Sequence, residues 1–265
     1  MTKNAIAMLE GWTITSLETI ENYDINTDDF LSGLDELTET TIQNTEESAD
    51  VTGKGGQTLF TIKKNKAVTG SGTSGYISGN LMSLQTGSDS EVGLINFRKH
   101  ESIIAKKGDT SVKTSEKATG TEGSEILSLL ITVGETTTKY TQGTAASENA
   151  FAYDPNSSTI TLPTGVFTEA GGNVEVVYNY QKQGAKIGNS ADTYGKTTHT
   201  FINCLGKNVC DEVYRIQIEI YRCDWNSNFD IALGGDGVTH PFQFKSLKDK
   251  CHGDNKFWDF KVYKD

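Results

Sequence analysis

Cysteine and histidine, the residue types best suited to binding a metal ion, are concentrated in the last quarter of the chain. This part contains all four cysteines and three of the four histidines: Cys204, Cys210, Cys223, Cys251, His199, His240 and His252. Zinc sites usually present ligand pairs at close spacing, such as two cysteines separated by two residues. No such pair occurs, so reduced cysteines are favoured over a zinc site, with an adventitious disulfide as the remaining alternative.

The sequence motifs of phosphate-binding and hydrolytic sites are also missing. The glycine-rich segment 52–56 resembles a phosphate-binding loop, but it precedes a predicted strand, whereas such a loop needs the N-terminus of a helix. Asp224, Asp230 and Asp236 flank or lie near a glycine pair, yet their spacing does not supply the ligands of a calcium loop. No two carboxylates stand out as a glycosidase pair. The sequence therefore predicts no enzyme, no metal and no cofactor.

The three tryptophans are the remaining residues that could bind a ligand, by stacking on a sugar or a base. Trp258 lies in an alternating strand and is predicted to belong to the core. Trp12 and Trp225 lie in less regular surroundings, where an interface position is an alternative.

The charge of the chain is concentrated at its start. The 265 residues carry a formal net charge of −11, and residues 1–50 hold twelve acidic side chains against one basic side chain, Lys3. Such a segment repels phosphate and anionic lipid, which argues against nucleic-acid binding there. It is either a solvated acidic face or an arm that meets a basic surface on a neighbouring subunit.

Local patterns indicate how the elements follow one another. Residues 1–50 are expected to form an acidic arm, with a short helical turn starting at Asp28 or Asp29 and running through Leu37. A glycine turn at 53–56 opens a strand over 58–69, and 77–86 is the best helix candidate. Residues 105–124 have almost no apolar side chains and are expected to form an exposed loop.

Strands dominate the remainder. Apolar side chains alternate with polar ones over 174–180 and 214–220, and an aromatic strand over 257–263 ends the chain. The predicted fold is all-β, a two-sheet sandwich or barrel of about nine or ten strands with one short α-helix. The expected organisation is an arm over 1–50 followed by one β-sandwich domain over 51–265. The sequence shows neither a secretory signal nor an apolar stretch long enough to span a membrane, which favours a cytoplasmic protein with reduced cysteines.

Three segments resemble the major tail tube proteins of tailed bacteriophages. They are the glycine turn and strand of 51–68, the unit from Tyr140 to Tyr180 with Asp154-Pro155, and the block from Ser227 to Cys251 that leads into Trp258–Tyr263. Together these segments cover about half of the chain.

The resemblance implies a protomer that forms hexameric rings, stacked into the hollow tube of the virion tail and assembled in the host bacterial cytoplasm. Other copies of the chain, a tape measure, a terminator and a baseplate or tip protein would be its partners. Genomic DNA would pass through the lumen without specific binding, and no membrane would be involved. Ring closure would also remove exposed sheet edges.

Two expectations about contacts between subunits follow. Acidic side chains of the arm (Asp28, Asp29, Glu46 and Glu47) are expected to pair with the basic strand residues Lys63, Lys64 and Lys66 of an adjacent protomer. The loop 105–124 is expected to join successive rings. Other virion subunits, such as a tail terminator or a capsid decoration protein, and a carbohydrate-binding or adhesin sandwich are the alternatives.

Overall fold

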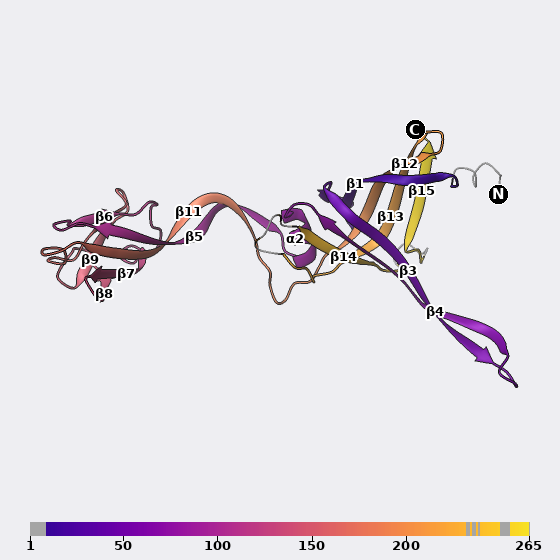
Figure 1. Cartoon of the computed structure of the whole chain (residues 1–265), viewed down its shortest axis with the longest axis horizontal. Coiled ribbons are helices and arrows are strands. Elements are labelled where there is room, and N and C mark those ends of the chain that lie inside the picture. Colours follow the sequence, from indigo (N-terminus) through magenta and orange to yellow (C-terminus); the bar gives the residue numbers. More distant parts are fainter. Residues whose placement is uncertain (1–8, 232–233, 235–236, 238, 250–254, 265) are drawn as a thin grey trace. The chain divides into compact units, whose positions relative to one another are not determined.

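The computed structural model describes residues 9–231, 234, 237, 239–249 and 255–264 (Figure 1). The chain divides into two compact units. The first unit comprises Met1–Ser90 and Ile187–Asp265, and the second unit, Glu91–Lys186, is inserted between them.

The sheet of the first unit has the strand order β2-β1-β12-β13-β14-β4-β3, and β15 also pairs with β13. Its strands are β1 (Trp12–Asp24), β2 (Phe30–Leu34), β3 (Leu37–Thr52), β4 (Thr58–Ser74), β12 (Thr197–Asn208), β13 (Val213–Trp225), β14 (His240–Ser246) and β15 (Trp258–Lys264). All pairs in this sheet are antiparallel.

Strand β13 is the branch point of this sheet. Its residues 214–220 pair with β15, whereas only 223–225 pair with β14. The predicted alternation of β13 places Ile216 and Ile220 in a core that also receives Phe242 and Phe244 from β14. The two branches therefore bury their apolar side chains in one shared cluster, as expected for a sandwich or barrel.

The one helix among the described residues, α2 (Gly79–Thr86), closes this core with Leu81 and Leu84. Ser78 caps its start, since its hydroxyl accepts a hydrogen bond from the Leu81 amide, and Gly87 ends it in the left-handed conformation with φ 71°. The helix predicted at 77–86 is thus confirmed. It is too short to cross a membrane, and no described helix is long and apolar enough to do so.

The second unit has its own sheet and its own core. The order is β5-β11-β7-β8-β9-β10-β6, with β5 (Ser90–Ala105), β6 (Ser111–Lys113), β7 (Ile126–Val133), β8 (Thr136–Gln142), β9 (Ala150–Asp154), β10 (Thr159–Thr161) and β11 (Gly172–Ile187). Leu129, Val176 and Tyr178 are fully buried in its core.

The structure confirms the all-β class but differs from the expected organisation in three places. The expected arm is folded into the first unit, because β1 and β2 bury Ile20 and Leu34, and a turn and β2 replace the helical turn expected from Asp28 or Asp29. Along the sequence, the boundaries between the compact units lie at 90/91 and 186/187, not at residue 50. The expected loop 105–124 contains β6, and Val112 and Ala118 anchor it to the core of the second unit.

Candidate functional site

The hairpin of β3 and β4 extends beyond the rest of its sheet (Figure 1). Its strands pair from Leu37 and Ser74 out to Thr52 and Thr58, while β14 pairs with β4 only from Val68 to Ser74. The outer part therefore has no neighbouring strand on either side among the described residues. Three large apolar side chains there remain exposed: Leu59 by 65%, Phe60 by 57% and Ile62 by 48%. An apolar group of this kind on a projecting element is typical of a surface that contacts another protein.

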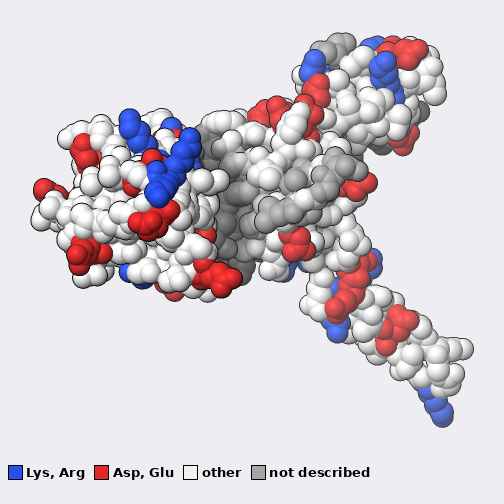
Figure 2. All heavy atoms as spheres, turned by 60° about the vertical axis from the view of Figure 1, so that its left-hand side comes forward, with Lys and Arg blue, Asp and Glu red and all other residues white. Residues whose placement is uncertain are grey.

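The hairpin also holds most of the charged residues that the sequence singled out. Lys63 Nζ lies 2.8 Å from Glu46 Oε1 in the same chain, and Glu47 faces Lys64 in the register of the two strands. The Lys63 hydrogen bond lowers the pKa of Glu46. Acidic and basic side chains are accordingly mixed along the hairpin (Figure 2). Glu46 and Lys63 thus attract each other within one chain, and because both groups are exposed this ion pair is weak and sensitive to salt. The predicted pairing between protomers stays a prediction.

The other two acidic residues lie in the turn between β1 and β2. Asp28 Oδ1 is 3.5 Å from His199 Nδ1, and the Asp29 carboxylate accepts a hydrogen bond from Thr27. Asp28, His199 and Tyr221 help to line a cavity of about 360 Å³. Asp28 and Asp29 thus belong to the turn between β1 and β2, whereas Lys63, Lys64 and Lys66 lie on β4.

The outward face of β12, β13 and β15 carries a network of polar side chains. Asn203 donates to Thr19 at 3.0 Å, and Gln217 donates to Asn203 at 3.0 Å. Glu219, only 8% exposed, is held by His199 at 2.9 Å and by Lys261. Such hydrogen bonds and ion pairs between neighbouring strands help to fix their register.

A second part of this network changes the acidity of its members. Tyr221 donates a hydrogen bond of 2.5 Å to Asp259, which also accepts one from Lys256 at 2.9 Å. Burial, together with this bond, raises the pKa of Tyr221 to about 12. The same hydrogen bonds lower the pKa of Asp259. Across the physiological pH range, Tyr221 therefore stays protonated as the donor and Asp259 stays ionised as the acceptor.

The cysteines and histidines that suggested metal chemistry are dispersed. Cys204 and Cys223 are buried and Cys210 is exposed, and burial raises the pKa of Cys204 to about 11. His240 is fully buried, accepts from the Ser78 amide and contacts Gln85. Cys251, His252 and Asp236 lie outside the described residues. Within the described part of the chain, no group of three His, Cys, Asp or Glu side chains could hold a metal ion.

The tryptophans also have structural positions. Trp225 is 2% exposed and donates to Thr198 at 2.9 Å, so its predicted alternative as an interface residue is wrong. Trp12 stacks on Phe260 with ring centroids 5.8 Å apart. Trp258 packs against the core, as predicted. The segment 52–56 forms the turn of the β3–β4 hairpin, as its glycines predicted.

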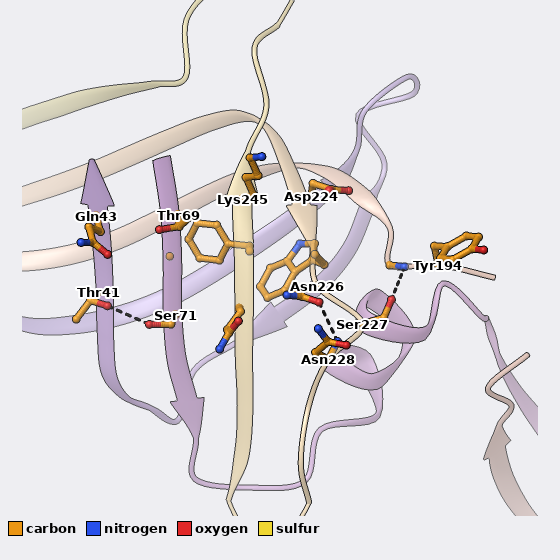
Figure 3. A pocket seen from close by; sticks show the side chains of 15 residues that line it. Thr41, Gln43, Thr69, Ser71, Tyr194, Asp224, Asn226, Ser227, Asn228 and Lys245 are labelled. Atoms are coloured by element: carbon orange, nitrogen blue, oxygen red, sulfur yellow. Dashed lines mark hydrogen bonds between the residues drawn. The ribbon is translucent and has the colours of Figure 1, made fainter. Parts of the chain in front are cut away.

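A surface depression of about 740 Å³ lies over the face of β3, β4 and β14 that points away from the core (Figure 3). Thr41, Gln43, Thr69, Ser71, Gln243 and Lys245 form its floor, and Tyr194, Asp224, Asn226, Ser227 and Asn228 form its wall. Figure 3 shows Thr41, Gln43 and Ser71 on one side and Asn226, Ser227 and Asn228 on the other. The lining combines amide and hydroxyl groups, which bind ligands through hydrogen bonds, with the aromatic residues Tyr194, Trp225 and Phe244.

The sequence did not reveal this polar pocket. Its residues come from five separate segments, none of which has a motif. The alternation of polar and apolar residues in 240–246 is the one local signal, since it places Gln243 and Lys245 on the same outward face.

The model of the YomU/Tube protein family matches residues 12–257. No curated protein matches the chain.

Proposed function

Because the chain belongs to the YomU/Tube protein family, whose model covers most of it, we propose that it polymerises as stacked hexameric rings into the tail tube of a bacteriophage. The family match agrees with the resemblance seen in the sequence as far as a tube-like structural protein. The hexameric ring, the tail and the passage of DNA are the proposed part.

The observation that carries this proposal is the β3–β4 hairpin with its exposed apolar end. Strand β3 is sixteen residues long and, among the described residues, pairs on one side only. A long, exposed edge strand favours uncontrolled association unless a regular partner covers it. A neighbouring protomer in a closed ring supplies such a partner for every copy at once.

The end of the hairpin is suited to a contact between successive rings. Leu59, Phe60 and Ile62 project on an element that has no core to enter. Burying each such side chain against another ring contributes about 1.5–3 kcal/mol. Charged contacts between subunits, by Asp28 and Asp29 from one protomer and Lys64 and Lys66 from another, are a weaker part of the same proposal, and added salt should reduce them.

The proposed lumen would let DNA pass without holding it. The chain has a net charge of −11, so the proposed tube as a whole carries an excess of negative charge, which repels phosphate. Specific or tight binding of DNA requires clustered cationic side chains that release counterions. In the virion tail, a tape measure, a terminator and a baseplate or tip protein would complete the structure, after assembly in the bacterial cytoplasm.

Negative-stain electron microscopy of the purified full chain tests the proposal. Long tubes with a central channel are expected above a critical concentration. Closed single rings that never stack would favour a tail terminator instead, and monomers at every concentration would overturn assembly altogether.

The hairpin has a matched test. The double variant Leu59→Ser/Phe60→Ser should raise the critical concentration for tubes at least about tenfold, because two buried contacts between rings are lost. Val209→Ser is the control, since Val209 is 98% exposed in the turn between β12 and β13. Normal tubes from the double variant would exclude the hairpin end as the contact between rings.

A further inference from the structure

The polar pocket over β3, β4 and β14 is not explained by folding. Its floor faces away from the apolar core, and several of its side chains make no hydrogen bond within the described part of the chain: Gln43, Thr69, Asn228, Gln243 and Lys245. Hydrogen bonds do organise the wall around them. The Asn226 amide donates to the Gln243 carbonyl at 2.9 Å, and the Asn228 amide donates to Asn226 Oδ1 at 2.9 Å.

Tyr194 is the second unexplained feature. Its side chain is 78% exposed, although its backbone is tightly held. A Cβ atom on Gly87 would lie 1.9 Å from the Tyr194 carbonyl oxygen, and one on Gly195 would lie 1.9 Å from the Trp225 carbonyl oxygen. Both glycines therefore permit close packing of this segment, and the Gly195 amide donates to Ser227 Oγ at 2.9 Å. The fold fixes the backbone of Tyr194 and leaves its aromatic ring exposed.

The charge of the lining narrows the choice of ligand. Asp224 and Lys245 are its only charged residues, so the formal charges cancel. An anion such as a nucleic acid needs an excess of cationic groups, and a cation needs an excess of carboxylates. A neutral ligand rich in hydroxyl groups needs neither an excess of cationic groups nor an excess of carboxylates. Each amide of Gln43, Gln243 and Asn228 offers donors and an acceptor side by side, which matches neighbouring hydroxyls on a sugar ring.

We propose that this pocket binds a neutral oligosaccharide. The amides of Gln43 and Gln243 and the hydroxyl of Thr69 bind sugar hydroxyls on the floor. Tyr194 at the edge of the wall supplies an exposed aromatic ring for stacking on the apolar side of a sugar unit. The open shape and the number of polar groups fit a chain of sugars better than a single small molecule.

Isothermal titration calorimetry of the full chain against three probes tests this inference. The probes are maltohexaose, cellohexaose and chitohexaose, each titrated up to about 10 mM, an upper limit for a weak specific site. At least one of them is expected to bind, and a hexanucleotide of thymidine is expected not to bind. Absence of binding by all three sugars, or stronger binding of the hexanucleotide, overturns the proposal.

Variants assign the binding to the pocket. Tyr194→Ala and Gln243→Ala should each weaken binding about tenfold, as expected when a stacking or hydrogen-bonding group is removed. Tyr76→Ala is the matched control, because Tyr76 is 65% exposed and lies outside the pocket. Gln243→Ala also keeps the test valid if Tyr194→Ala fails to fold.

The tube proposal and this inference fail separately. Sugar binding is measured on subunits below the critical concentration, and tube formation is scored by microscopy. Unchanged sugar affinity in both pocket variants overturns the site. If they fail to form tubes and the wild-type chain binds no sugar, the pocket is an interface between copies, and the oligosaccharide proposal is wrong.

Discussion

Gly70 shows how a single residue sets the packing of the first unit. It lies on β4 beneath Phe244, and a Cβ atom at this position would lie 2.0 Å from the end of the phenyl ring. Gly70→Ala should therefore reduce the free energy of unfolding of the first unit by about 1–3 kcal/mol, the usual cost of an overpacked core. Chemical denaturation followed by tryptophan fluorescence measures it, since Trp12, Trp225 and Trp258 all lie in the first unit.

The control for this prediction is Gly188→Ala. Gly188 lies in the same unit and has no atom within 4 Å of an added Cβ. The free energy of unfolding of Gly188→Ala should stay within about 0.5 kcal/mol of the wild-type value. Equal losses in the two variants would mean that backbone freedom, and not contact with Phe244, explains the glycine at position 70.

His240 makes the stability of the first unit depend on pH. Its ring is fully buried, Nδ1 accepts a hydrogen bond of 3.3 Å from the Ser78 amide, and Nε2 lies 2.7 Å from Gln85 Oε1. This arrangement requires the neutral ring, and burial lowers the pKa of His240. Its contribution is fully present above the ordinary histidine pKa of about 6.5 and is lost as the pH falls from there toward the lowered value in the folded state.

We expect the free energy of unfolding to fall by up to about 1.4 kcal/mol per pH unit below about pH 6.5. His240→Gln should flatten this dependence, whereas His100→Gln should retain it because His100 is exposed. Denaturation curves between pH 5 and pH 7.5 measure both. A slope that is unchanged in His240→Gln would assign the pH dependence to another group.

At the scale of the elements, the sequence predicted those whose pattern is local. The period-two alternation of 174–180 and 214–220 identified β11 and β13, and the short apolar group near Leu81 identified α2. These elements bury one regular face, so their own residues carry the signal.

The elements that the sequence missed depend on distant partners. Strand β1 buries Asn22, whose side chain bonds to Ser32 and to Thr200, on a strand about 180 residues later. A buried asparagine is acceptable only when such partners are present, and a local pattern does not show them. Residues 105–124 likewise differ from the expected loop, because a few scattered small or apolar residues, Ala105, Val112 and Ala118, anchor them to the core.

The candidate site was predictable to a similar degree. The sequence predicts pairing between Glu46 and Lys63 of adjacent protomers, whereas the structure pairs them within one chain, because the register of the hairpin brings them together; pairing between protomers stays a prediction. Tyr194 and the polar pocket were missed because their residues assemble from separate segments.

At the scale of the whole molecule, the main feature is the insertion of one compact unit into another. The second unit begins and ends with Glu91 and Lys186, whose side chains form an ion pair of 3.0 Å. Its two ends are therefore adjacent, and each unit has its own buried core. Insertion with adjacent ends is typical of units that fold independently.

We predict that residues 91–186 fold alone and that the first unit folds when this segment is replaced by a short Gly-Ser linker. Circular dichroism and cooperative thermal unfolding of the two products measure this. As a control, the fragment 91–171, which lacks β11, should not unfold cooperatively, because β11 lies between β5 and β7. An unfolded 91–186 fragment would contradict the independence of the units.

The insertion also determines the order in which the protein can fold during translation. Ile20 pairs with Ile202 and Val68 pairs with Ser246, so β1 and the inner part of β4 leave the ribosome long before their other partners, β12 and β14, exist. At about 5–20 residues per second, this wait lasts roughly ten seconds or more, during which the inserted unit can fold first. The rate of translation therefore sets when the first unit can fold. The nascent chain completes the sheet that carries the β3–β4 hairpin only after the last quarter of the chain has been synthesised.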